Sequence, residues 1–200
     1  MKSLLWFSLL VVCLSPAFAQ EINPNQKHGS TSQDDEATII YSKAGAFLVE
    51  APKGWIADTT TGKRLGLCCV YYPEGSTWDT AGTVMYPNIA TKGPGQETLK
   101  EFMVHDLASF REHDPGLRYV DGKDIPLKHN RIAMLRYFFG VNKSSSEAVA
   151  YVDEEKMISV LVVSSKTENG LNKSIPLLRQ MLGTYYFMYV KNGNEEKPAK

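Results

Sequence analysis

Residues 131–164, RIAMLRYFFGVNKSSSEAVAYVDEEKMISVLVVS, predict three consecutive strands of one sheet. The strands are expected at 131–141, 147–152 and 156–164, because each is rich in β-branched and aromatic residues and short polar turns separate them. Residues 157–163, MISVLVV, are apolar at both alternating phases, so this sheet needs cover on both faces. The short connections between successive strands indicate a mainly antiparallel sheet.

The remaining elements supply further strands and that cover. Strands are expected at 38–41, 47–51, 64–72, 82–90 and 117–120, with an extension of the last to residue 127 as an alternative. A helix is expected at 96–113, where apolar residues recur at helical spacing and Thr98 and Glu101 fit a capping box. A second helix is expected at 169–182, either kinked by Pro176 or beginning there with Ser174 as its cap, and residues 185–189 pack against its end or extend from it. Two helices on two faces give an α/β (α+β) fold, an α/β/α sandwich around a mainly antiparallel sheet.

Residues 1–19 have the features of a signal peptide. Lys2 gives a positive start, residues 4–14 form an apolar run, and the motif Ala17-Phe18-Ala19 predicts cleavage after Ala19. The run is about half of the ~20 residues that a membrane helix needs, so we expect no transmembrane anchor in the mature chain. We expect a secreted or periplasmic protein with a flexible leader at 20–37, a single domain at 38–191 and a disordered tail at 192–200.

Charge and motifs exclude several classes of function. The 200-residue chain has 22 basic and 22 acidic residues, so it lacks the basic footprint of a nucleic-acid-binding protein. The sequence holds no G-x-G-x-x-G, P-loop or G-x-S-x-G motif, and we predict neither a cofactor nor catalytic residues. His105, His113 and His129 lack the spacing of a zincin helix, so no metal site is predicted.

Two cysteines, Cys68 and Cys69, fall within the strand predicted at 64–72. Neighbouring side chains of a strand point to opposite faces, so a bond between the two would require a break in the strand. We interpret them as two small buried apolar residues. A redox-active vicinal disulfide, a bridge to another chain and metal capture are the alternatives.

Asp106 is an unusual residue of the first predicted helix, because it lies about 20° from Leu99 in the middle of the apolar stripe. Arg136 is equally unusual, since it shares a strand face with apolar residues such as Phe138. Burying either charge alone is costly. A buried polar pair of Asp106 and Arg136 would satisfy both, and a functional carboxylate at Asp106 is the alternative.

The polar loop at 73–80 contains a tryptophan, Trp78. A large aromatic side chain in such a loop is either a lid over the core or a contact residue for a partner. We predict a contact surface at this loop, formed by Trp78, Glu74, Asp79 and the adjacent Tyr72.

Three stretches resemble the Mog1/PsbP-like family, including its bacterial secreted members of unknown function. They are FLVEAPKGW at 47–55, QETLKEF at 96–102 and the closing strand and helix at 157–187. The resemblance implies the fold. It does not imply an activity, because family members range from photosystem subunits to trafficking factors and uncharacterised envelope proteins.

The leading hypothesis is an exported, non-catalytic module that binds a protein partner or a small ligand in the cell envelope. One alternative is an envelope hydrolase or thiol-redox enzyme that uses Cys68 and Cys69 or Asp106. Another is an assembly factor for an envelope complex. The export signal and the lack of a recognisable catalytic motif favour the binding module.

Overall fold

A computed structural model describes residues 37–141 and 145–188 of the chain. The predicted signal peptide, the predicted tail and all but the last residue of the predicted leader lie outside these described residues. None of the helices in the described ranges has the length and the apolar character needed to cross a membrane.

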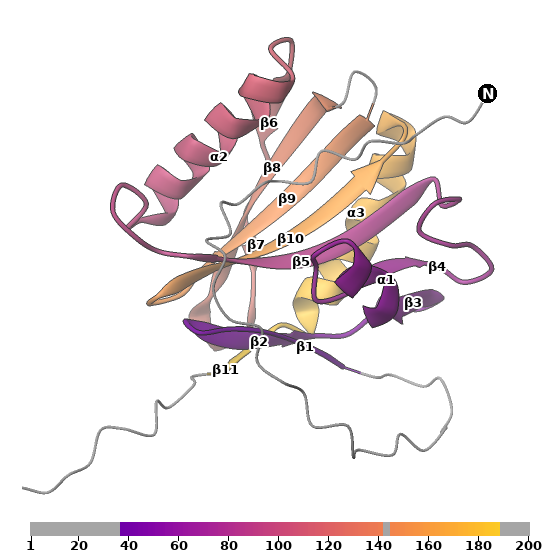
Figure 1. Cartoon of the computed structure of the whole chain (residues 1–200), viewed down its shortest axis with the longest axis horizontal. Coiled ribbons are helices and arrows are strands. Elements are labelled where there is room, and N and C mark those ends of the chain that lie inside the picture. The colour runs from indigo at the N-terminus through magenta and orange to yellow at the C-terminus, as the bar shows by residue number, and fades with distance from the viewer. Residues whose placement is uncertain (1–36, 142–144, 189–200) are drawn as a thin grey trace, which may run out of the picture.

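The larger of two sheets has eight strands in the order β3-β4-β5-β10-β9-β8-β6, and β7 also pairs with β8 (Figure 1). Every strand pairing is antiparallel, which confirms the prediction of a mainly antiparallel sheet. The strands are β3 (Trp55–Asp58), β4 (Val70–Pro73), β5 (Thr83–Thr91), β6 (Arg118–Asp121), β7 (Ile125–Pro126), β8 (Ile132–Val141), β9 (Ser145–Asp153) and β10 (Met157–Ser165).

The three consecutive strands predicted within 131–164 are confirmed as β8, β9 and β10, and the register of this meander aligns residues across the sheet. Tyr151 of β9 lies opposite Met134 of β8 on one side and Val160 of β10 on the other. Val160 in turn lies opposite Asn88 of β5. Because side chains alternate between the two faces of a sheet, these residues form one row on a single face.

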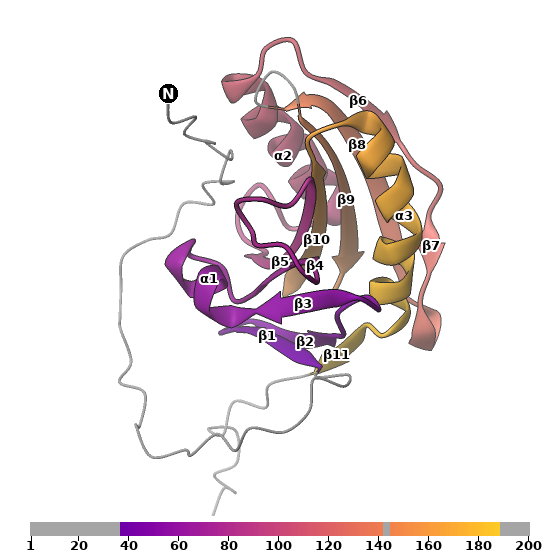
Figure 2. The ribbon, with the colours of Figure 1, turned by 90° about the vertical axis from the view of Figure 1, so that its right-hand side faces the viewer.

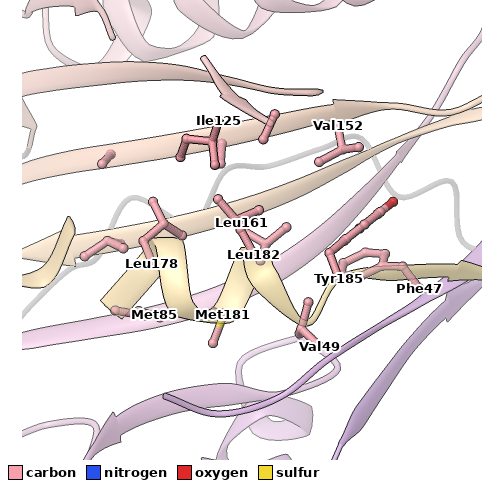
Figure 3. Packing of buried hydrophobic residues seen from close by; sticks show 14 of the residues in the cluster. Phe47, Val49, Met85, Ile125, Val152, Leu161, Leu178, Met181, Leu182 and Tyr185 are labelled. Atoms are coloured by element: carbon pink, nitrogen blue, oxygen red, sulfur yellow. The ribbon is translucent and has the colours of Figure 1, made fainter. Parts of the chain in front are cut away.

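Two helices cover opposite faces of this sheet (Figure 2). The first is α2 (Leu99–His113), which begins at the predicted capping box: the Glu101 backbone N–H donates to Thr98 Oγ1 at 3.2 Å. The second is α3 (Glu168–Gly183), whose apolar residues pack with the opposite face of the meander (Figure 3). Thr167 caps α3 and Pro176 lies in its interior, so the prediction of Ser174 as the cap is wrong.

The smaller sheet consists of β1 (Thr38–Ser42), β2 (Gly45–Val49) and β11 (Tyr186–Met188), with β2 in the centre. The strands predicted at 38–41 and 47–51 are confirmed and pair as a hairpin, and the segment after α3 supplies the third strand. Ile40 and Phe47 on the inner face join the core beneath α3. The outer face carries Ile39 and Tyr41, which are 52% and 70% exposed.

The strand predicted at 64–72 is wrong over most of its length. A short helix, α1 (Thr59–Arg64), occupies its start, and a loop leads from there to β4. The Asp58 side chain caps α1 by accepting a hydrogen bond from the Thr61 N–H at 2.8 Å. Gly66 ends the turn with φ +77°, a backbone conformation that a continuous strand does not allow. Only Val70–Pro73 remains as a strand, because the chain must first turn back from α1.

Candidate functional site

The loop at 73–80 does not form the predicted contact surface as a unit. Trp78 is 5% exposed and packs with Tyr72 and Val84, with its ring 6.2 Å from that of Tyr86. The prediction of Trp78 as an exposed contact residue therefore needs correction, since it is a lid over the core. The aromatic ring turns inward because burying it removes a large apolar area from water.

The other predicted contact residues divide between core and solvent. The hydroxyl of Tyr72 donates to Asp58 Oδ2 at 2.7 Å, so this side chain is engaged within the fold. Glu74 and Asp79 are exposed. Contact of these two carboxylates with a partner stays a prediction.

Asp106 and Arg136 do not form the predicted ion pair. Asp106 is 4% exposed on the buried side of α2, and the Tyr151 hydroxyl donates a hydrogen bond to it. Arg136 donates through Nε to Asp121 Oδ1 at 2.6 Å and through Nη1 to the Met103 carbonyl oxygen at 3.1 Å. The reason is the sheet register, which places Asp121 of β6 directly opposite Arg136 of β8.

A small cavity lies between α2 and the sheet, next to Asp106. Its volume is about 20 Å³, which is room for about one water molecule. The helix contributes Phe102, Asp106 and Phe110, and strands β5, β9 and β10 contribute Tyr86, Asn88, Ala90, Val149, Val160 and Val162. The wall is therefore mostly apolar and carries three polar side chains.

The backbone of α2 stays farther from the sheet than that of α3. Large rings fill the space between them: Phe110 stacks on Phe138 with ring centres 4.3 Å apart, and Phe102 meets Tyr151 edge-on at 6.0 Å. The cavity lies beside these rings, since Phe102 and Phe110 both line it.

The three polar groups offer different hydrogen-bonding roles. Asn88 Oδ1 accepts from the Ile89 N–H at 2.8 Å, which leaves the amide N–H groups of Asn88 as donors. Burial raises the pKa of Tyr86 well above its usual range, so its hydroxyl stays protonated and can also donate. The carboxyl of Asp106 is the acceptor of the set. The three side chains therefore present both donors and an acceptor to the cavity.

Two buried carboxyl groups beneath α2 are protonated more readily than usual. Burial raises the pKa of Asp106 to about 6, although the hydrogen bond from Tyr151 and the charge of Arg136 both lower it. Burial also raises the pKa of Glu147 to about 7; a hydrogen bond from the Ser164 hydroxyl lowers it, and the charge of Asp106 adds to the increase. Groups with such values exchange protons near neutral pH.

Sequence reasoning missed Glu147 and Asn88. The available signal for Glu147 was strand alternation, because Glu147 has the same phase as Val149 and Tyr151, which are buried. Asn88 gave no signal of its own. Its place at the cavity follows from the pairing of β5 with β10, which joins segments far apart in the sequence.

The cysteines are free thiols in the loop between α1 and β4. Cys69 is fully buried, and burial raises its pKa to about 11, so little thiolate forms at neutral pH. Its interpretation as a buried apolar residue is confirmed, whereas Cys68 is half-buried. The alternation argument was wrong, because the two residues precede the strand.

The histidines lie on the surface of the described chain. His113 caps the end of α2 through Nδ1, which lies 2.9 Å from the Ser109 carbonyl oxygen. His129 is exposed beside Tyr186. Within residues 37–141 and 145–188, no three potential metal ligands come together.

Comparisons with protein-family models and with curated protein sequences give no match. Among solved structures, PsbP (CyanoP) from Synechocystis sp. PCC 6803 is similar with a TM-score of 0.50 and 14% identity, over 80% of this chain and 98% of that one. A variant of Mog1 has a TM-score of 0.47 and 14% identity, over 77% of this chain and 96% of that one. The fold is thus Mog1/PsbP-like, and at this identity the likeness concerns the fold alone.

Proposed function

We propose that this Mog1/PsbP-like chain is an exported binding module that holds a small ligand in the cavity beneath α2. The observation that carries the proposal is the pairing of an apolar wall with three convergent polar groups, Tyr86, Asn88 and Asp106. Small-molecule sites commonly have this composition. Export rests on the predicted signal peptide, and a mature chain that does not begin at Gln20 would contradict the predicted cleavage.

The ligand class follows from the chemistry of the cavity. A buried carboxyl acceptor among aromatic rings suits an amine or another strong hydrogen-bond donor on a small apolar body. The cavity holds about one water as it stands, so α2 must move outward to admit such a ligand. The wider separation of α2 from the sheet is consistent with that movement, because less backbone packing opposes it.

A matched pair of probes tests the site: benzylamine and benzyl alcohol, which share a shape and differ in charge. We expect both to shift the methyl NMR signals of Val149, Val160 and Val162, because these side chains line the cavity. Asp106→Asn should weaken benzylamine binding at least fivefold and leave benzyl alcohol nearly unchanged. The loss of the carboxylate removes only the contact with the charged group.

Two variants separate cavity binding from surface binding. Val160→Phe fills the cavity and should abolish the response to both probes, at a cost of about 1–3 kcal/mol in stability from overpacking. Val104→Phe changes an exposed position of α2, where the side chain is 62% exposed, and should leave the response intact. If neither probe shifts the cavity methyls at millimolar concentration, the ligand-site proposal is wrong.

The enzyme alternatives receive less support from the same geometry. A carboxyl with a pKa of about 6 suits a general base, which favours Asp106 as the catalytic group of a hydrolase. However, the residues that line the cavity include no serine, threonine, cysteine or histidine to act as a nucleophile. The thiol-redox alternative requires a reactive thiolate, and burial disfavours it at Cys69.

A further inference from the structure

Strand β1 forms an open edge of the smaller sheet. The strand order β1-β2-β11 leaves one side of β1 without a paired strand among the described residues. Ile39 and Tyr41 on this strand are 52% and 70% exposed, while Ile40 between them is buried in the core. Within residues 37–141 and 145–188, β1 thus has no hydrogen-bonded strand on that side, although β5 lies close to it, and its outer face carries exposed apolar side chains.

This edge also lacks the devices that usually prevent strand addition. Natural edge strands carry charges, prolines, bulges or very short lengths that block pairing with another chain. The larger sheet follows this rule, since the edge strand β3 ends in Asp58 and the edge strand β6 contains Arg118 and Asp121. The sequence of β1, TIIYS, has neither a charge nor a proline.

The sequence of β1 is complementary to itself in antiparallel register. With Ile40 at the centre, Ile39 of one copy lies opposite Tyr41 of the other, and Thr38 lies opposite Ser42. A pair of an aromatic with a β-branched residue is favourable across antiparallel strands, so the two Ile39–Tyr41 pairs carry the contact. The Ser42 hydroxyl does not add to it, because it accepts from the Ala44 N–H at 3.1 Å within its own turn. Since both copies contribute the same strand, the contact closes on itself by twofold symmetry and does not propagate.

We propose that β1 pairs with β1 of a second copy of this chain, centred on Ile40, and joins the two smaller sheets into one continuous sheet. The pairing covers the exposed side of Ile39 and Tyr41 and satisfies the open backbone groups of β1. The contact is short, so the dimer is expected to be weak and dependent on concentration. This proposal is independent of the cavity beneath α2, which lies against the larger sheet.

Sedimentation of the exported chain at increasing concentration tests the dimer. We expect a concentration-dependent shift from monomer to dimer. Ile39→Lys alone and Tyr41→Glu alone should each weaken dimerisation at least tenfold, because each places a charge opposite an apolar residue of the second copy. Both positions are exposed, so the fold should tolerate the changes.

Mixing the two variants tests the register. In the proposed pairing the new lysine at position 39 of one chain lies opposite the new glutamate at position 41 of the other, so the mixture should form a heterodimer in preference to either homodimer. Val104→Lys also charges an exposed apolar residue, but on α2, and should dimerise like the original chain.

Three outcomes overturn the proposal. The first is a chain that stays monomeric at every concentration, as it would if another segment occupied the edge of β1. The second is a dimer that the changes at Ile39 and Tyr41 leave intact, because it would use a different surface. The third is a mixture of the two variants that fails to associate, which would contradict the register centred on Ile40.

Discussion

Replacing Asp106 with asparagine should stabilise the protein, and the gain should grow with pH. Burial raises the pKa of Asp106 to about 6 in the native state, from an ordinary value of 3.8 in the unfolded chain. Below pH 3.8 both states hold the proton, so this carboxyl does not affect stability. As the pH rises from there to 6, the unfolded chain releases its proton first, and the native state loses stability.

The size of the effect follows from these two pKa values. One pH unit corresponds to about 1.4 kcal/mol, so the ionisation of Asp106 costs the native state about 3 kcal/mol at pH 8. Asparagine carries no charge, and its amide oxygen can still accept the hydrogen bond from Tyr151. We therefore expect Asp106→Asn to add about 3 kcal/mol at pH 8 and only about 0.5 kcal/mol at pH 4. For a domain of this size the gain at pH 8 is about 6–12 °C in Tm.

Urea denaturation followed by tryptophan fluorescence at pH 4, 6 and 8 measures the difference in unfolding free energy. Asp79→Asn is the matched control, because it removes one negative charge from an exposed position. The charge of Asp106 also raises the pKa of Glu147, so its removal should add to the gain. A loss of stability that is equal at pH 4 and pH 8 would refute the argument, since it would mean that ionising Asp106 costs nothing.

Other positions give simpler expectations. Trp78→Ala should destabilise the protein by about 3–5 kcal/mol, because it empties a buried site; a change below about 1 kcal/mol in urea denaturation would contradict the lid. In a Cys68→Ser chain that begins at Gln20 and so lacks Cys13, Cys69 should react with a thiol reagent only after denaturation, and reaction at the rate of a free thiol in the native protein would contradict its burial. Thr98→Ala should cost about 1 kcal/mol through loss of the capping box, and an unchanged denaturation midpoint would contradict that role.

Local patterns in the sequence predicted most of the fold. The meander was visible because each of its strands is rich in β-branched and aromatic residues and residues 157–163 are apolar in both phases. The helix α2 was visible because helical periodicity and a capping box coincide at Thr98. The strand prediction at 64–72 was wrong because this segment is also apolar in both phases. There the helix α1 has the sequence TTTGKR, whose threonines and glycine are poor helix formers. The capping residue Asp58 was the only local signal for it.

The candidate site was less accessible to sequence reasoning. Both Asp106 and Arg136 were identified as unusual polar residues, and both do lie between α2 and the sheet. Their partners could not be predicted, because Asp121 and Tyr151 reach them through strand register and not through proximity in the sequence. Asn88 likewise reaches the site through strand register, in the pairing of β5 with β10.

The pairing of β5 with β10 also constrains how the chain can fold during synthesis. Thr91 of β5 lies opposite Met157 of β10, and the roughly 65 residues between them take about 3–13 s to synthesise. Until then β5 lacks its partner strand β10. Phe47 of β2 lies opposite Phe187 of β11, which is synthesised later than β10. A nascent chain therefore completes neither sheet until β10 and β11 have been synthesised, so its early strands stay without these partners for most of the synthesis of residues 38–188.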